Sequence, residues 1–125
     1  MKVLTVDDSS VVRKIIRGAV EVLEYQLLEA EDGYEALDIL EKQYVDVKLI
    51  LLDWNMPGIN GFELLKSIKE NKKYKKIPVM MVTTESEKEN IIQAIQAGAC
   101  HYLVKPFTMD ELTKRMLECV GKGEV

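Results

Sequence analysis

Cysteine, proline and histidine are scarce in this sequence of 125 residues, which contains two cysteines, three prolines and one histidine. Cys100 and Cys119 do not form a Cys-X-X-Cys pair, and they are too few to build a disulfide framework. We therefore expect two reduced, buried thiols. The single histidine, His101, has no second histidine to pair with, and we expect it to be a surface residue rather than a relay or a ligand.

Long apolar runs and an excess of basic residues are also missing. The Val3–Val6 segment is too short for the core of a signal peptide, and no later run approaches the length that spans a bilayer. Acidic residues outnumber basic ones 21 to 17, and the net charge of −4 argues against non-specific binding to nucleic acid or anionic membranes. We expect a soluble, cytoplasmic protein.

What the sequence does contain is a regular alternation of apolar segments and helical patterns. Its length and its 47% hydrophobic content suit a single domain over residues 1–125. Short apolar segments predict strands at residues 2–6, 26–30, 47–52, 78–83 and 100–104. Helical patterns follow them at residues 10–23, 33–40, 61–70, 87–97 and 109–120. Strict alternation of this kind predicts a doubly wound α/β fold, with a parallel five-stranded sheet and helices on both faces.

Four of the predicted helices carry an apolar stripe. The stripe positions are Val12, Ile15, Ile16, Ala19, Val20 and Leu23 in the first helix, Phe62, Leu65 and Ile68 in the third, Ile91, Ile92 and Ile95 in the fourth, and Leu112, Met116, Cys119 and Val120 in the fifth. Gly98 is well placed to end the fourth helix in a left-handed conformation, and Gly121 and Gly123 are expected to end the fifth.

Polar residues stand where the predicted strands end. Asp7 and Asp8 follow the first strand, and Asp53 follows the third, where the apolar run 49–52 meets a loop containing Pro57 and Gly58. Because parallel strands end on the same edge of a sheet, these side chains should lie together. Lys105 follows the fifth strand and Thr83 closes the fourth, which adds an ammonium and a hydroxyl group to the same edge.

The expected gathering of carboxylates calls for a cation. Two like charges 4 Å apart repel by about 4 kcal/mol at a surface-like dielectric constant, and Lys105 alone cannot balance three carboxylates. Oxygen ligands without histidine or cysteine favour a hard ion such as Mg²⁺, which in proteins often also binds phosphate. An aspartate can act as a nucleophile to give an aspartyl-phosphate, and Asp53 is the candidate acceptor.

The combined motifs resemble those of the receiver domains of two-component response regulators, over essentially the whole chain. The matching stretches are Asp7-Asp8-Ser9, Asp53-Trp54-Asn55-Met56-Pro57, Val82-Thr83, Glu89-Asn90-Ile91-Ile92-Gln93-Ala94, Ala97-Gly98-Ala99 and Val104-Lys105-Pro106-Phe107-Thr108. The resemblance is strongest to the stand-alone regulators of chemotaxis. It implies a flavodoxin-like sheet with strand order 2-1-3-4-5.

The resemblance also implies roles for individual residues in phosphorylation. Asp53 would accept a phosphoryl group from a sensor histidine kinase of the chemotaxis type. Mg²⁺ would be bound by Asp8, Asp53 and the backbone carbonyl of Asn55, with Asp7 assisting through water. Lys105 would contact the phosphoryl oxygens.

Further roles concern the switch and its output. Thr83 would also contact the phosphoryl group, and Tyr102 would swing inward as Thr83 moves. Asn55, Thr84 and Glu85 would control access and dephosphorylation. The peptide bond between Lys105 and Pro106 is expected to be cis. The output surface would comprise residues 88–97, 101–104 and 110–120.

The resemblance implies three partners, namely the kinase, a target such as the flagellar motor switch, and a phosphatase. The protein is expected to be a monomer. It would catalyse only its own phosphorylation and dephosphorylation. Two features are departures or stay unassigned. Thr84 stands where the family usually has a smaller residue, and the tract Lys72–Lys76 is expected to be a solvated loop.

Two other functions fit these motifs less well. An Asp-nucleophile phosphatase of the haloacid dehalogenase type would need an acidic residue at position 55, where this sequence has Asn55. In a flavodoxin-like flavin binder, Asp7 and Asp8 would repel the flavin phosphate. A phosphorelay intermediate, or a receiver cut from a larger DNA-binding regulator, stays open. The positions of Met1 and of the last helix favour a natural single-domain protein.

Overall fold

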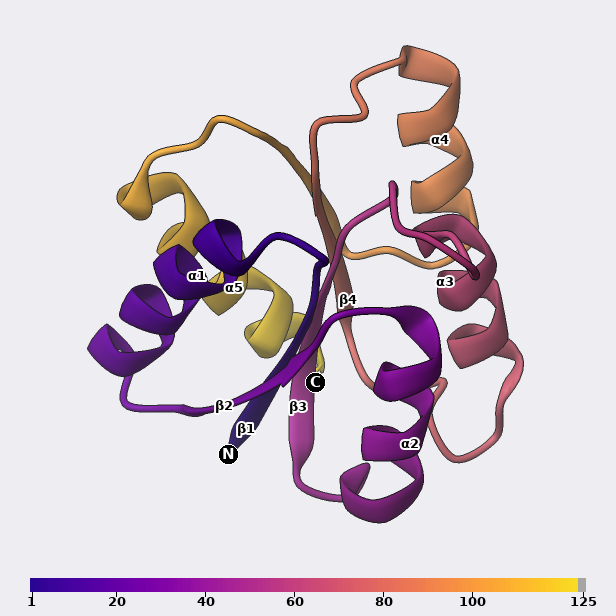
Figure 1. Cartoon of the computed structure of the whole chain (residues 1–125), viewed down its shortest axis with the longest axis horizontal. Coiled ribbons are helices and arrows are strands. Elements are labelled where there is room, and N and C mark those ends of the chain that lie inside the picture. The colour runs from indigo at the N-terminus through magenta and orange to yellow at the C-terminus, as the bar shows by residue number, and fades with distance from the viewer. Residues whose placement is uncertain (124–125) are drawn as a thin grey trace.

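The computed structural model describes residues 1–123, which form five strands and five helices in strict alternation (Figure 1). The strands are β1 (Lys2–Val6), β2 (Gln26–Ala30), β3 (Val47–Leu52), β4 (Val79–Thr83) and β5 (His101–Val104). The helices are α1 (Ser10–Val22), α2 (Gly33–Gln43), α3 (Gly61–Glu70), α4 (Lys88–Gln96) and α5 (Met109–Gly123). The predicted order of elements is confirmed, and three strands match the prediction residue for residue.

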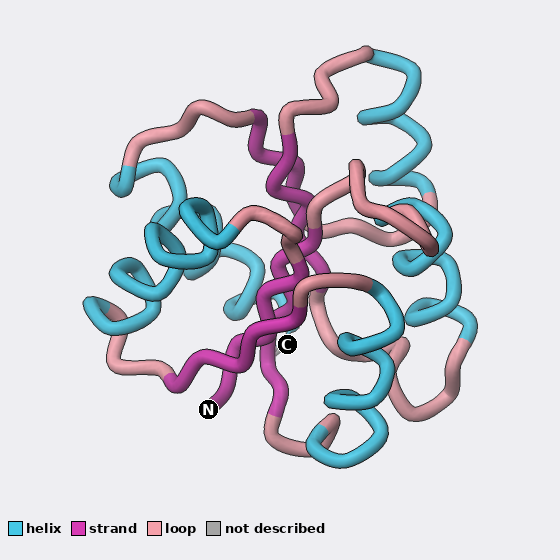
Figure 2. The backbone as a smooth tube through the Cα atoms, in the orientation of Figure 1, coloured by secondary structure: helices cyan, strands magenta, loops and turns pink. Residues whose placement is uncertain are grey.

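All strand pairs are parallel, and the sheet order is β2-β1-β3-β4-β5, as the family resemblance implied. The sheet runs through the middle of the molecule, with α1 and α5 on one face and α2, α3 and α4 on the other (Figures 1 and 2). The doubly wound α/β fold is therefore confirmed. Within residues 1–123, no helix has the length and apolar character needed to cross a membrane.

The central strand β3 shows why its sequence lacks polar alternation. Ile50 and Leu52 belong to the core under α2, α3 and α4, whereas Leu49 and Leu51 belong to the core under α1 and α5. All four side chains are almost fully buried. Helices cover both faces of the strand, so each successive residue must be apolar, and the chain then leaves the sheet at Asp53.

Helix starts follow the capping residues of the sequence. Ser9 accepts a hydrogen bond from the backbone N–H of Val12 (3.3 Å), and Asp32 accepts one from that of Glu35 (2.8 Å). Such caps satisfy backbone donors that have no partner within the helix. They fix where α1 and α2 begin, directly after the strand edge that carries the polar residues.

Two of the predicted helix stripes are only partly buried. In α1, Ile16, Ala19 and Val20 are buried but Ile15 is 43% exposed. In α4, Ile92 and Ile95 are both 45% exposed, and the buried side chain is Ala94. Helix α4 lies against β5, a strand of four residues at the sheet edge, so a narrow strip of the helix meets the core. Its isoleucines form an exposed apolar surface.

The expectation of two reduced thiols is wrong, because Cys100 and Cys119 are joined by a disulfide in the structure, with their Cα atoms 5.8 Å apart. Cys100 immediately precedes β5, and Cys119 is fully buried on α5. The two residues meet because α5 packs on β5, and the spacing of cysteines in the sequence carries no information about that packing.

Backbone features at the element ends follow the sequence with one exception. Gly98, which directly follows the last turn of α4, has a φ of +112°, as predicted, and the Lys105-Pro106 peptide bond is cis. In contrast, α5 continues through Gly121 to Gly123. Gly121 therefore does not end the helix as expected.

Candidate functional site

The carboxyl ends of β1, β3 and β5 bring Asp7, Asp53 and Lys105 to one edge of the sheet. Extensions of the strand hydrogen bonding hold the three backbones there. The N–H of Asp7 donates to Ala30 (3.0 Å), that of Asp53 donates to Val6 (3.0 Å), and that of Lys105 donates to the carbonyl of Thr83 (2.8 Å). The positions of these side chains are thus set by the sheet rather than by flexible loops.

The acidic group at this edge consists of Asp7, Asp8 and Asp53. Each residue has a carboxylate oxygen within 4.8 Å of one on the other two. Asp7 and Asp53 are buried, being 2% and 6% exposed, whereas Asp8 is exposed. Two of the carboxylates are therefore largely removed from water, and the third lies on the solvent side of the site.

Lys105 is the cation within the group. Its ammonium nitrogen lies 2.8 Å from Oδ2 of Asp7 and 3.3 Å from Oδ2 of Asp53. One ammonium balances one of the three carboxylates. Burial raises the pKa of Asp7, and the charge of Asp53 raises it further, while hydrogen bonds from Lys105 and from the N–H of Ser9 lower it. The buried negative charge of Asp7 is incompletely compensated.

The donor set fits a hard divalent cation. Three carboxylates contribute oxygen atoms at close quarters, which are the ligands that Mg²⁺ prefers, and such an ion would relieve the excess negative charge. The backbone N–H of Asn55 donates to Oδ1 of Asp53 (3.3 Å), so the loop after β3 folds back onto the Asp53 carboxylate. The residues that would hold the ion are Asp7, Asp8 and Asp53; the role of the Asn55 carbonyl stays a prediction.

The uncompensated charge of Asp7 gives a test of this electrostatic account. We expect Asp7→Asn to stabilise the metal-free protein at neutral pH by on the order of 1 kcal/mol, seen as a rise in Tm of about 4 °C. Because folding raises the pKa of Asp7 above 3.8, the wild-type protein is stabilised relative to the variant as the pH falls through that raised pKa. The advantage of Asp7→Asn should vanish below pH 3.8.

The control is Asp8→Asn, in which the same change is made at an exposed carboxylate. We expect this variant to leave the Tm of the metal-free protein nearly unchanged, while both variants weaken Mg²⁺ binding. Thermal unfolding with and without Mg²⁺ measures both effects. A metal-free Asp7→Asn protein less stable than wild type would show that Lys105 compensates Asp7 fully.

A chain of hydrogen bonds leads from the site to β5 through the backbone of Glu85. The hydroxyl of Thr83, which is fully buried, accepts from the N–H of Glu85 (3.2 Å). The hydroxyl of Tyr102 donates to the carbonyl of the same residue (2.7 Å). Burial, with the charges of Glu85 and Asp53, raises the pKa of Tyr102 to about 12, so the phenol stays a donor. Thr84 is exposed beside this chain.

Arg13 belongs to the site although no sequence motif predicted it. Its guanidinium donates to the carbonyl of Asp7 (2.7 Å) and lies 3.3 Å from a carboxylate oxygen of Glu29 and 3.6 Å from one of Glu31. Arg13 thereby holds the acidic loop after β1 against the end of β2. Its carboxylate partners lie on β2 and just after it, so no local sequence signal identifies Arg13.

Trp54 lies next to the site, whereas His101 lies at the far end of β5 from it. Trp54 adjoins Asp53 and stacks on Phe62, with ring centroids 5.2 Å apart, so its indole can report changes at Asp53. His101 lies at the start of β5, at the opposite end of that strand from Lys105, with Nε2 2.9 Å from Oε2 of Glu118 on α5. The half-buried His101 is therefore part of the β5–α5 contact rather than a simple surface residue.

The chain is similar to a known protein family and to several curated proteins. The model of the response regulator receiver domain family matches residues 3–117. A chemotaxis protein CheY homologue of Campylobacter jejuni is 47% identical over 124 residues, covering 98% of this chain and 95% of the relative. The chemotaxis protein CheY1 of Helicobacter pylori is 42% identical over 125 residues, covering 99% of this chain and 100% of the relative.

Solved structures show the same fold. The chemotaxis protein CheY4 of Vibrio cholerae has a TM-score of 0.86 at 36% identity, with 94% of this chain and 97% of that chain covered. A probable two-component response regulator with a GGDEF domain has a TM-score of 0.91 at 27% identity, with all of this chain but 51% of that chain covered. The fold thus occurs both in chains of similar length and as one part of a longer chain.

Proposed function

This chain belongs to the response regulator receiver family, and from that membership we propose that it is a stand-alone regulator of the CheY chemotaxis type that accepts a phosphoryl group on Asp53. The observation that supports this proposal is the convergence of Asp7, Asp8 and Asp53 with the ammonium group of Lys105 at one strand edge. Mg²⁺ is the proposed cofactor. The donor is a sensor histidine kinase.

The proposed reaction uses Asp53 as nucleophile. A carboxylate oxygen of Asp53 attacks the phosphorus of a phosphohistidine, so that a P–O bond forms as the P–N bond breaks and the imidazole nitrogen leaves with its electron pair. Lys105, now 3.3 Å from Oδ2 of Asp53, is placed to move its ammonium group onto a phosphoryl oxygen. A bound Mg²⁺ would neutralise negative charge on the phosphoryl group. The protein would catalyse only its own phosphorylation and dephosphorylation.

Phosphorylation would be read out through Thr83 and Tyr102. In the structure, the N–H of Glu85 donates a hydrogen bond to the hydroxyl of Thr83, and the carbonyl of Glu85 accepts one from the hydroxyl of Tyr102. Movement of the Thr83 hydroxyl toward a phosphoryl group would break the first bond and shift the loop that holds Tyr102. The added phosphoryl oxygens bond Thr83 and Lys105 in one conformation only, so they shift a pre-existing equilibrium toward it. Asn55, Thr84 and Glu85 are proposed to control access to the phosphoryl group.

The proposed output surface is formed by α4, β5 and α5. Ile92 and Ile95 are each 45% exposed on it, and such apolar side chains favour protein binding. The proposed target is a flagellar motor switch protein, and a phosphatase is a further expected partner. We expect a cytoplasmic monomer, folded as one domain, that does not bind nucleic acid.

Phosphotransfer tests the proposal. A sensor kinase of the chemotaxis type, phosphorylated with a radioactive phosphoryl group, would be mixed with the protein in the presence of Mg²⁺. The labelled phosphoryl group should move to the protein within the mixing time or shortly after. Removal of Mg²⁺ by a chelator should stop the transfer. Transfer followed by passage to a second histidine-containing protein, without binding to a motor switch protein, would favour the phosphorelay alternative.

Thr83→Ala separates phosphorylation from its readout. The variant should still accept phosphate, but the gain in affinity for the target on phosphorylation should fall by about tenfold, or about 1.4 kcal/mol of coupling free energy. Thr84→Ala is the matched control, because Thr84 is an exposed residue, and this variant should keep the full gain. Target binding is compared at complete phosphorylation. A normal gain in Thr83→Ala would place the switch elsewhere.

A further inference from the structure

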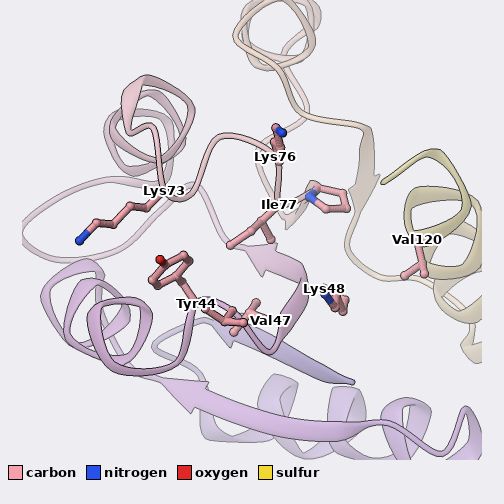
Figure 3. A pocket seen from close by; sticks show the side chains of 9 residues that line it. Tyr44, Val47, Lys48, Lys73, Lys76, Ile77 and Val120 are labelled. Atoms are coloured by element: carbon pink, nitrogen blue, oxygen red, sulfur yellow. The ribbon is translucent and has the colours of Figure 1, made fainter. Parts of the chain in front are cut away.

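A cavity of about 320 Å³ lies at the opposite edge of the sheet from Asp53, where β3 begins and the chain enters β4 (Figure 3). Its apolar lining includes Val47 at the start of β3, Ile77 just before β4, and Val120 on α5. All three are buried core residues. The phosphorylation site does not use any of them, so the cavity is a separate feature of the molecule.

Three lysines surround this apolar floor. Lys48 comes from β3, while Lys73 and Lys76 come from the loop between α3 and β4, and all three line the cavity (Figure 3). Tyr44 forms another part of the wall. The lining therefore combines a hydrophobic base with a positively charged rim, which is a pattern typical of binding sites for amphipathic ligands.

The three ammonium groups are not neutralised within the described residues 1–123. The ion pairs and side-chain hydrogen bonds of that part of the chain involve other lysines, namely Lys2, Lys69 and Lys105. Lys72 and Lys75 add two more positive charges nearby, although the whole chain carries a net charge of −4. This local excess of positive charge would attract an anion.

The loop that carries Lys73 and Lys76 is held in place. Tyr74 is buried, and its ring meets that of Tyr44 edge to face with centroids 5.5 Å apart. The N–H of Ile77 donates to the carbonyl of Tyr74 (2.9 Å), and the ammonium of Lys69 donates to the carbonyl of Ile77 (2.7 Å). The expected solvated loop is thus anchored to the core, and the rim of the cavity is pre-formed.

We propose that this cavity binds a small organic anion with an apolar body. The apolar part packs on Val47 and Ile77, and the acidic group binds at the lysine rim, where the positive charge of Lys48, Lys73 and Lys76 attracts it. The volume is at the lower end of the range for small-molecule pockets, which fits one ring system with one acidic group. The site is independent of Asp53 and needs no Mg²⁺.

The test uses naphthalene-1-sulfonate as the probe, with backbone amide NMR shifts as the readout. We expect saturable shifts at Val47, Lys48 and Ile77, which persist in Asp53→Asn and without Mg²⁺. Neither methanesulfonate, which lacks the apolar body, nor naphthol, which lacks the charge, should give comparable binding. Because Asp53 is not involved, this result neither supports nor weakens the proposed phosphorylation.

A pair of double variants isolates the role of the rim. Lys73→Gln/Lys76→Gln should weaken probe binding by about fivefold, since each substitution removes one positive charge from the rim. Lys72→Gln/Lys75→Gln removes the same charge from the same loop at residues that do not line the cavity, and it should leave the affinity within twofold. If the two double variants weakened probe binding equally, the effect would come from net charge alone, and the proposed site would be wrong. Shifts centred elsewhere, or no saturable shifts, would also overturn it.

Discussion

An Asp53→Asn variant is expected to lose the whole change in Trp54 fluorescence that acetyl phosphate produces in the wild-type protein with Mg²⁺. The amide has nearly the shape of the carboxylate but is not a nucleophile, so no phosphoryl group can be added at this position. The indole of Trp54 adjoins the acceptor and is stacked on Phe62, and it should respond to charge added beside it.

The matched control is Asp46→Asn, since Asp46 has a 63% exposed side chain and precedes β3, at the opposite end of that strand from Asp53. This variant should show the full fluorescence response. Circular dichroism should confirm that both variants are folded. A full response in Asp53→Asn would remove Asp53 as the acceptor.

Gly61→Ala, a substitution at the first residue of α3, is expected to be strongly destabilising. A Cβ atom at Gly61 would collide with the carbonyl oxygen of Asp53 and would lie 2.7 Å from the Cα of Trp54. The N–H of Gly61 also donates to the carbonyl of Trp54 (2.8 Å), which fixes the close approach. Overpacking of backbone against backbone should cost about 3 kcal/mol, or about 10 °C in Tm.

Gly121→Ala provides the comparison, because nothing lies within 4 Å of a Cβ added there, within α5. Alanine is the better helix former, so this variant should be neutral or more stable by up to about 1 kcal/mol. Denaturant unfolding measures both. If Gly61→Ala were as stable as wild type, the close approach of α3 to the backbone of Asp53 and Trp54 would be wrong.

Residues 49–52 show how much of the fold is predictable from sequence. Four consecutive aliphatic residues are needed only by a strand covered on both faces, and the polar residues that end the strands are expected at the same edge of a parallel sheet. The sequence alone therefore predicts that Asp7, Asp53 and Lys105 lie together, and their contacts confirm it. The strand order does not follow from such patterns, and its prediction came from the family resemblance.

The features that were missed depend on contacts between elements distant in the chain. The disulfide between Cys100 and Cys119 exists because α5 packs on β5, and Arg13 matters through partners on and after β2. The helical period predicted that Ile92 and Ile95 share a face, but it cannot say how much of that face the neighbouring strand covers. Hydrogen bonds of the backbone, such as those of Glu85 with Thr83 and Tyr102, also cannot be predicted from side-chain motifs.

The most direct test of phosphorylation at Asp53 is to locate the phosphoryl group itself. The protein would be treated with acetyl phosphate and Mg²⁺, and the acyl phosphate would be reduced with borohydride, which converts a phosphorylated aspartate to homoserine. Peptide mass spectrometry then identifies the modified residue. We predict one added phosphoryl group and homoserine at position 53 alone. Modification at Asp7, Asp8 or His101, or no modification under conditions in which Mg²⁺ is bound, would contradict this assignment.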